Sequence, residues 1–162
     1  MKQKKVAIIM GSRSDLAEVE KTAKVLSDLG IGYEMHIISA HRTPDTASEF
    51  AKRAEAEGFD VIIAAAGKAA HLAGVMAAGT VLPVIGIPMK TGDLGGMDSL
   101  LSTVQMPKGV PVATVAIGGA ENAAILAAQI LACSDNGLRA ALKEYRKKMA
   151  EEVAEADREL NK

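Results

Sequence analysis

Five short apolar runs recur along the chain, and each is followed by a stretch with helical features. Short continuous apolar runs predict β-strands, and runs without alternating polar residues predict strands that are buried on both faces. The run "YEMHII" is one of these and is likewise expected to be a buried strand. The predicted strands are 5–10, 33–38, 60–66, 83–88 and 112–117.

The intervening stretches predict helices. The first has apolar residues three or four positions apart and is expected to end at Gly30, a residue type common just past helix C-termini. In the second, Thr43 is the expected N-cap and Pro44 the first helical residue, with the helix running to Gly58. Further helices are expected at about 70–79, 97–105, 121–132 and 135–160.

Buried strands that alternate with helices predict a parallel sheet covered on both faces, because each crossover is right-handed. We therefore expect a three-layer, doubly wound, flavodoxin-like α/β fold with five strands. The 162 residues fit one domain, with a core over 4–133 and an extra helix at about 135–160. The apolar stripe of that helix either faces solvent or packs on another subunit.

Composition narrows the possible partners. A net charge of −1 gives no electrostatic basis for binding nucleic acid or a membrane surface. The single cysteine, Cys133, cannot form an intrachain disulfide, and we expect it to be a small buried helix residue in a reducing cytoplasm. The start of the chain does not resemble a signal peptide, and no apolar stretch is long enough to span a bilayer, which again favours the cytoplasm.

In this fold, ligands bind at the carboxyl ends of the strands, so the loops after the strands are the places to look for chemistry. Four of these loops are rich in glycine, and the remaining one contains "SAHRTPD". The five loops are 11–15, 39–45, 67–71, 89–96 and 118–122.

The loop "GSRSD" combines backbone N–H groups with the hydroxyls of Ser12 and Ser14 at a helix start, which favours an anion site. An alternative is that Ser14 or Asp15 merely caps the helix. The loop matches neither a Walker A motif nor a G-x-G-x-x-G fingerprint, which disfavours nucleoside triphosphates and dinucleotides.

The loop "SAHRTPD" carries the clearest signal. Arg42 can hold a phosphate or carboxylate bidentately, and His41 can exchange a proton near neutral pH. His71 opens a short helix at the same expected edge, where a functional and a structural role are equally plausible, whereas His36 lies within a strand and favours a packed or surface role. The three histidines have no cysteine or paired carboxylates at ligand spacing, so no metal site is expected.

Taken together, "IIMGSRSD", "SAHRTPD", "GKAAHLAG" and "DSLLSTVQMPKGVPVATVAI" resemble the N5-carboxyaminoimidazole ribonucleotide mutases of purine biosynthesis. The resemblance runs from residue 5 to about 132, with the motifs in the family's order and spacing. It implies a reversible, cofactor-free shift of a carboxylate from the exocyclic N5 to the ring carbon C4 of a phosphoribosyl aminoimidazole. It also implies a cytoplasmic homo-octamer with active sites at subunit junctions.

The resemblance also implies roles for individual residues. His41 corresponds to the general acid/base and Arg42 to the phosphate-binding arginine, while Ser12 and Asp15 correspond to positions that hold the ribose phosphate and hydroxyls. His71 stands in a loop that encloses the base and carboxylate, and is taken as a second catalytic residue. The other expected substrate-binding residues are Gly11, Ser39, Ala40, Gly67, Lys68, Ala69 and Leu72.

Two positions depart from the family pattern: Lys68 replaces a glycine and Ala73 replaces a proline. A sister branch, which carboxylates aminoimidazole ribonucleotide directly with CO2, tends to carry a basic residue at the position of Lys68. That branch reads His-Lys-Thr where this chain has "HRT" and lacks the pair formed here by His71 and Leu72. The CO2-using carboxylase is therefore the alternative function, and a flavodoxin-like electron carrier or receiver domain is a more distant one.

Overall fold

The computed structural model describes residues 4–162, so residues 1–3 of the expected domain lie outside the described part. Five parallel strands form one sheet in the order β2-β1-β3-β4-β5. This arrangement confirms the predicted doubly wound, flavodoxin-like fold. The strands are β1 (Lys5–Met10), β2 (Gly32–Ile37), β3 (Val61–Ala66), β4 (Val84–Pro88) and β5 (Ala113–Thr114).

Helices follow the strands much as their spacing predicts. The described elements are a short 3₁₀ turn η1 (Arg13–Asp15), α1 (Leu16–Asp28), α2 (Pro44–Arg53), α3 (Leu72–Gly79), α4 (Met97–Val104), α5 (Ala120–Ala132) and α6 (Asn136–Leu160). Gly30 lies just past α1 with a φ of 70°, as expected of a C-terminal glycine. α2 ends at Arg53 rather than Gly58, because the chain continues as hydrogen-bonded turns that close at Gly58.

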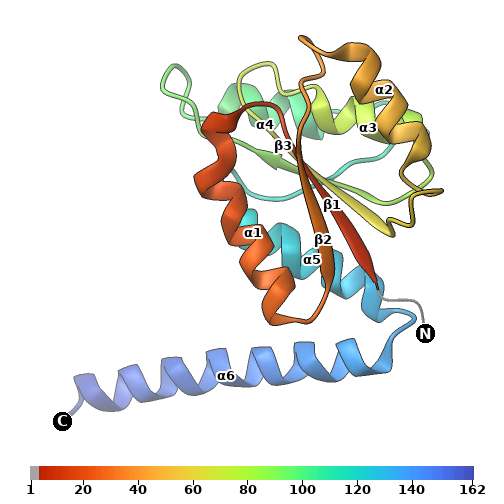
Figure 1. Ribbon diagram of the computed structural model, residues 1–162. Helices are drawn as coiled ribbons and strands as arrows, with labels where there is room; N and C mark the ends of the chain where they lie inside the picture. The colour runs from red at the N-terminus through yellow and green to blue at the C-terminus, as the bar shows by residue number, and fades with distance from the viewer. Residues whose placement is uncertain (1–3) are drawn as a thin grey trace.

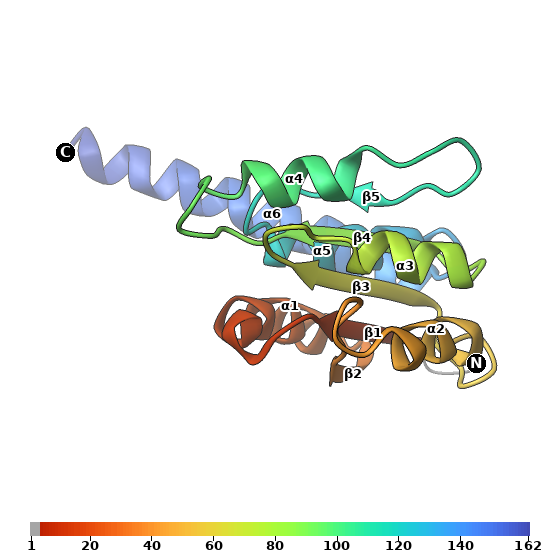
Figure 2. The same cartoon turned by 90° about the horizontal axis from the view of Figure 1, so that it is seen from above.

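Helices cover both faces of the sheet (Figures 1 and 2), and the sheet separates two apolar cores. Alternate residues of β1 point to opposite faces, so Ile8 packs in one core and Ile9 in the other. α1 and α5 cover the first face, and α2 and α3 cover the second. α4 contacts β4 and β5 on the same side as α3.

α5 is packed through alanine. Its buried face consists of alanines that are at most 5% exposed, apart from one leucine. Such small side chains let α1 approach closely, and the buried hydroxyl of Thr22 on α1 donates a hydrogen bond to the carbonyl of Ala120 at 2.8 Å. The alanine-rich sequence therefore produces close helix packing within the subunit.

The edge strands differ from the sequence prediction. The sequence predicts that β2 is buried, but β2 lies at the edge of the sheet, where Tyr33 and Ile37 are exposed. The expected strand 112–117 is regular only over Ala113–Thr114. Beyond that point Val115 still donates to the carbonyl of Gly86, so the chain follows β4 without forming a regular ladder.

α6 packs on α5 at its start and then runs out beyond the rest of the domain (Figure 1). Leu138 is buried, but the same apolar stripe becomes exposed farther along, reaching 50% at Met149 and 72% at Val153. Cys133 is exposed, so the prediction of a buried thiol is wrong; it lies at the C-terminal end of α5, where the helix gives way to a turn. Within residues 4–162, no helix combines the length and apolar character that a bilayer crossing requires.

Candidate active site

The carboxyl ends of β1 and β3 lie next to each other, while the chain connections diverge on either side of them. This is the switch point at which ligands bind in open α/β sheets. A cavity of about 490 Å³ opens there, within the usual size range of small-molecule sites. Every residue predicted for the site lines this cavity: Gly11, Ser12, Asp15, Ser39, Ala40, His41, Arg42, Gly67, Lys68, Ala69, His71 and Leu72.

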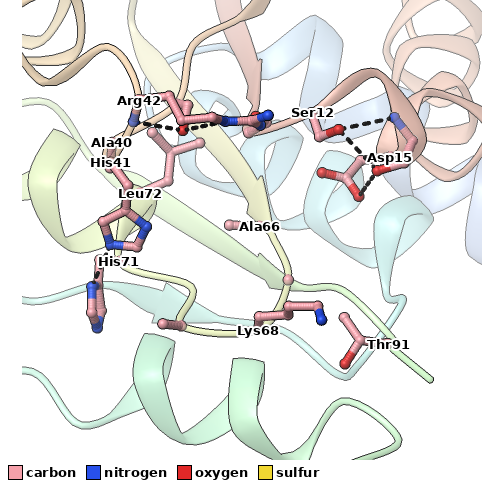
Figure 3. A pocket seen from close by; sticks show the side chains of 15 residues that line it. Ser12, Asp15, Ala40, His41, Arg42, Ala66, Lys68, His71, Leu72 and Thr91 are labelled. Carbon is pink, nitrogen blue, oxygen red and sulfur yellow. Dashed lines mark hydrogen bonds between the residues drawn. The ribbon is translucent and has the colours of Figure 1, made fainter. Parts of the chain in front are cut away.

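The loop after β1 forms one wall of the cavity. The Ser12 hydroxyl accepts hydrogen bonds from the backbone N–H and the hydroxyl of Ser14, at 3.3 Å and 3.0 Å. Burial against the cavity raises the pKa of the Asp15 carboxyl, although hydrogen bonds with Ser14 and Ser12 oppose the shift. Hydroxyls, backbone N–H groups and a carboxylate thus meet where α1 begins (Figure 3).

The loop after β2 is a compact turn. The Thr43 hydroxyl donates to the carbonyl of Ser39 at 2.9 Å and accepts from its N–H at 3.0 Å. Thr43 is the N-cap residue as predicted, but its side chain makes no capping bond to α2 because it is engaged in this turn. The turn projects His41 and Arg42 out of the sheet edge toward the cavity.

Arg42 is oriented by two neighbours. Its Nη2 donates to the carbonyl of Gly11 at 2.8 Å, and its Nε lies 3.4 Å from the Ser39 hydroxyl. A guanidinium has five N–H groups, so donors remain for an anion in the cavity. The contact with Gly11 also joins the loops after β1 and β2, which places the cation beside the start of α1 (Figure 3).

His41 and His71 form a pair. His41 Nε2 lies 2.8 Å from His71 Nδ1, and the two rings are nearly perpendicular. One of these nitrogens must carry the proton that the other accepts. Figure 3 shows the two side chains directed toward each other at the side of the cavity opposite Asp15.

The loop after β3 approaches the loop after β4 closely. A Cβ on Gly67 would lie 2.8 Å from Thr91 Cγ2, so a larger residue there would push Thr91 away. Thr91 lines the cavity together with Ser14 and Ala66. Neither Thr91 nor Ala66 is predicted for the site from the sequence, although Thr91 lies in the loop 89–96, one of the five loops expected at the ligand-binding edge.

Lys68 and Asp93 form an ion pair at 2.8 Å, with both side chains largely exposed. The hydrogen bond between them raises the pKa of Lys68 and lowers the pKa of Asp93, so both remain ionised at neutral pH. Lys68 has a φ of 57°, which L-residues rarely adopt.

Other candidates lie outside this cavity. The loop 118–122 after β5 contributes no lining residue. His36 packs its ring against Phe50, with 5.1 Å between centroids, on the edge strand, as its position in a strand predicts. Among the described residues, no group of histidine, cysteine, aspartate and glutamate is placed to hold a metal ion.

The chain is similar to known proteins over most of its length. Residues 5–152 match a family model described as AIR carboxylase. A protein of Thermotoga maritima named N5-carboxyaminoimidazole ribonucleotide mutase is 55% identical over 96% of this chain and 91% of its own length. Proteins of the same name from Brucella melitensis and Escherichia coli K12 are 58% and 51% identical, each over 93% of this chain and over 94% and 90% of their own lengths.

A solved structure agrees in fold. The crystal structure of Treponema denticola PurE superposes with a TM-score of 0.88 at 32% identity, and the match covers 99% of this chain and 100% of that one. A family match over most of the chain, relatives more than half identical and a shared fold lead to one conclusion: this chain belongs to the AIR carboxylase family.

Proposed function

We propose that this chain is an N5-carboxyaminoimidazole ribonucleotide mutase of purine biosynthesis, which moves the carboxylate of its substrate from N5 to C4. The observation that carries the proposal is the pair formed by His41 and His71, 2.8 Å apart, in the same cavity as Arg42. The proteins that are 51–58% identical bear the name of this activity.

Substrate is held by its phosphoribosyl group. Arg42 and the start of α1, with Ser12, bind the 5-phosphate, because a guanidinium, a hydroxyl and the positive end of a helix dipole suit an anion. The Asp15 carboxyl accepts hydrogen bonds from the ribose hydroxyls. This places the imidazole over Gly67 and Ala69, where small side chains leave room for a planar ring. Gly11, Ser39, Ala40 and Leu72 enclose it, and Lys68 lies at the rim of the same cavity.

The transfer proceeds in two balanced steps. The bond between N5 and the carboxyl carbon breaks, CO2 is released into the cavity, and His41 donates a proton to N5. C4 then attacks the retained CO2, and the C4 proton returns to His41. His71 supports both steps because its Nδ1 is within hydrogen-bond distance of His41 Nε2. The two reaction steps change no oxidation state, and the proton that His41 donates to N5 is replaced by the one it accepts from C4. We therefore propose that the reaction uses no cofactor.

The experiment compares two substrate combinations. Purified enzyme is given either N5-carboxyaminoimidazole ribonucleotide, or aminoimidazole ribonucleotide with bicarbonate, and formation of the 4-carboxy product is followed. The mutase is expected to turn over the first much faster than the second. Turnover with the second combination alone would contradict the proposal and assign the CO2-using carboxylase instead.

We also propose that the enzyme is a homo-octamer. Exposed apolar side chains on α6 support this, since Met149 is 50% and Val153 72% exposed in the subunit. Light scattering with size-exclusion chromatography is expected to give eight subunits, and Met149→Glu combined with Val153→Glu is expected to reduce that number. A monomer at micromolar concentration would contradict the proposal.

A cytoplasmic location is proposed as well. The exposed, unpaired thiol of Cys133 suits a reducing compartment. Fractionation of cells that express the tagged chain tests this proposal.

A further inference from the structure

Lys68 has an unusual backbone for a residue with a side chain. In the described residues 4–162 it is the one residue other than glycine with a positive φ, at 57°. Glycine adopts this conformation without strain, whereas an L-residue does so at a cost. The Lys68 side chain is 73% exposed, so packing does not offset that cost. Any compensating stabilisation must therefore come from the contact that the Lys68 ammonium makes.

The ammonium reaches the loop between β4 and α4. Lys68 Nζ lies 2.8 Å from Asp93 Oδ2, at the exposed tip of that loop. The base of the loop is fixed separately, since Met89 N–H donates to Ala66 and the Ser99 hydroxyl bonds the carbonyls of Met89 and Gly96. Among the described residues, the ion pair is the side-chain contact that joins the tip to the loop after β3.

The same two loops line the cavity. Lys68 extends from the loop after β3 toward Thr91, which lies on the loop after β4 (Figure 3). Thr91 Cγ2 would be only 2.8 Å from a Cβ on Gly67, so the loops already touch at their bases. The ion pair extends this contact outward to the exposed rim.

We propose that Lys68 is a positioning residue: by pairing with Asp93, it holds the loop 89–96 against the loop 67–71 and slows the escape of CO2 from the cavity. The inference rests on the proposed function, in which cleavage at N5 releases CO2 that C4 must capture. CO2 carries no net charge, so enclosure by the cavity walls is the main way to retain it. An ion pair that ties the two loops together across the rim therefore raises the fraction of CO2 that C4 captures.

Hydrogen exchange tests the tie without substrate. Lys68→Ala and Asp93→Asn are each expected to speed exchange of the amides in 90–96 by about 3–10-fold, because the loop tip opens more often. Lys90→Ala is the matched control: this lysine lies in the same loop and forms no ion pair with any described residue. Lys68→Gly serves as a second variant, since glycine adopts the backbone without strain and preserves the fold.

Carbon labelling tests the consequence for catalysis. Substrate with a ¹³C carboxylate is turned over in unlabelled bicarbonate, and the label missing from the 4-carboxy product measures escape. We expect escape to rise by about 3–10-fold in Lys68→Ala and in Asp93→Asn. The double variant should lose no more than either single variant, since both remove one contact. Lys68→Arg is expected to restore most retention. Adding 1 M KCl should increase escape only in the enzymes that keep the ion pair, namely the unsubstituted enzyme and Lys68→Arg.

Two results would overturn the inference. One is unchanged loop exchange and unchanged label escape in both single variants. The other is an effect of Lys68→Ala that Asp93→Asn does not share, which would mean that Lys68 acts directly on substrate. If the unsubstituted enzyme transfers no carboxylate, the proposed function and the CO2-retention role both fail, whereas the exchange experiment still decides whether the tie exists.

Discussion

The loops after β1 and β5 are alike in sequence but not in what they build. "GSRSD" and "GGAEN" both place small and charged residues at the start of a helix. The first forms a wall of the cavity, while the second contributes no residue to it. β1 lies at the switch point beside β3, whereas β5 is the far edge strand, separated from β3 by β4. A loop takes part in the site because of its strand's place in the sheet.

The difference between the loops after β1 and β5 leads to a testable expectation about function. Changes in the loops after β1, β2 and β3 should affect binding or catalysis, and comparable changes after β5 should not.

The largest effect is expected from His41→Asn. Without its imidazole, the enzyme loses the group that donates to N5 and accepts from C4, so transfer should slow by about 10²–10⁴-fold. Substrate affinity should change little, since the phosphate contacts remain. Single-turnover kinetics and calorimetric titration check the two quantities. Near-normal rates would remove His41 from the chemistry.

Arg42→Ala should instead act on affinity. Loss of a charged contact to the 5-phosphate is expected to weaken binding by about 2–4 kcal/mol, with a smaller change in the rate of bound substrate. The Gly11 carbonyl also loses its partner, so thermal unfolding should be measured alongside. An unchanged dissociation constant would exclude the phosphate contact.

Asp15→Asn is expected to stabilise the protein slightly. Burial raises the pKa of Asp15, so the native state holds this proton more tightly than the unfolded state. The stability that this group contributes is therefore present at low pH and lost as the pH rises through its native pKa. At pH 7 the neutral amide should raise Tm by at most about 3 °C, because the carboxyl is only half-buried.

The pH dependence separates this effect from a general one. The gain should shrink as the pH falls from the raised native pKa of Asp15 toward the ordinary aspartate pKa of 3.8, below which Asp15 is protonated in both the native and the unfolded state. A gain that is independent of pH, measured by urea unfolding between pH 4 and 7, would show that ionisation of Asp15 is not its cause.

The smallest effect is expected from Glu121→Gln, in the first turn of the helix α5 that follows β5. This exposed residue lies outside the cavity, so rate and affinity should stay within about twofold of the unsubstituted enzyme. A loss comparable to that of Arg42→Ala would break the comparison between the two loops.

The pattern of apolar residues along the chain predicts most of the fold and the location of the site. Continuous apolar runs identified the strands of the parallel sheet, and the rule that ligands bind beyond their carboxyl ends directed attention to the loops that line the cavity. The pairing of His41 with His71 could not be predicted from spacing. It requires β1 and β3 to be neighbours with β2 outside them, and strand order is not encoded in hydrophobic period.

The wrong predictions have a common cause. Exposure depends on where an element lies in the finished fold, while apolar character only indicates that it can be buried. "YEMHII" became an exposed edge strand because no neighbour pairs beyond it, and Cys133 became exposed because α5 ends there. Thr43 is the N-cap residue of α2, as predicted, but its hydroxyl donates a hydrogen bond to the carbonyl of Ser39 instead of capping the helix.

The alanine face of α5 limits how this chain can change over generations. Ala123, Ala124, Ala127 and Ala128 are fully buried, so a valine or leucine at any of them would collide with packed neighbours. Serine or glycine would fit the space but would weaken the helix or bury an extra hydroxyl. We therefore expect related sequences to carry only alanine, serine or glycine on this face of α5. Exposed positions of the helix, such as Glu121 and Gln129, should accept many residue types.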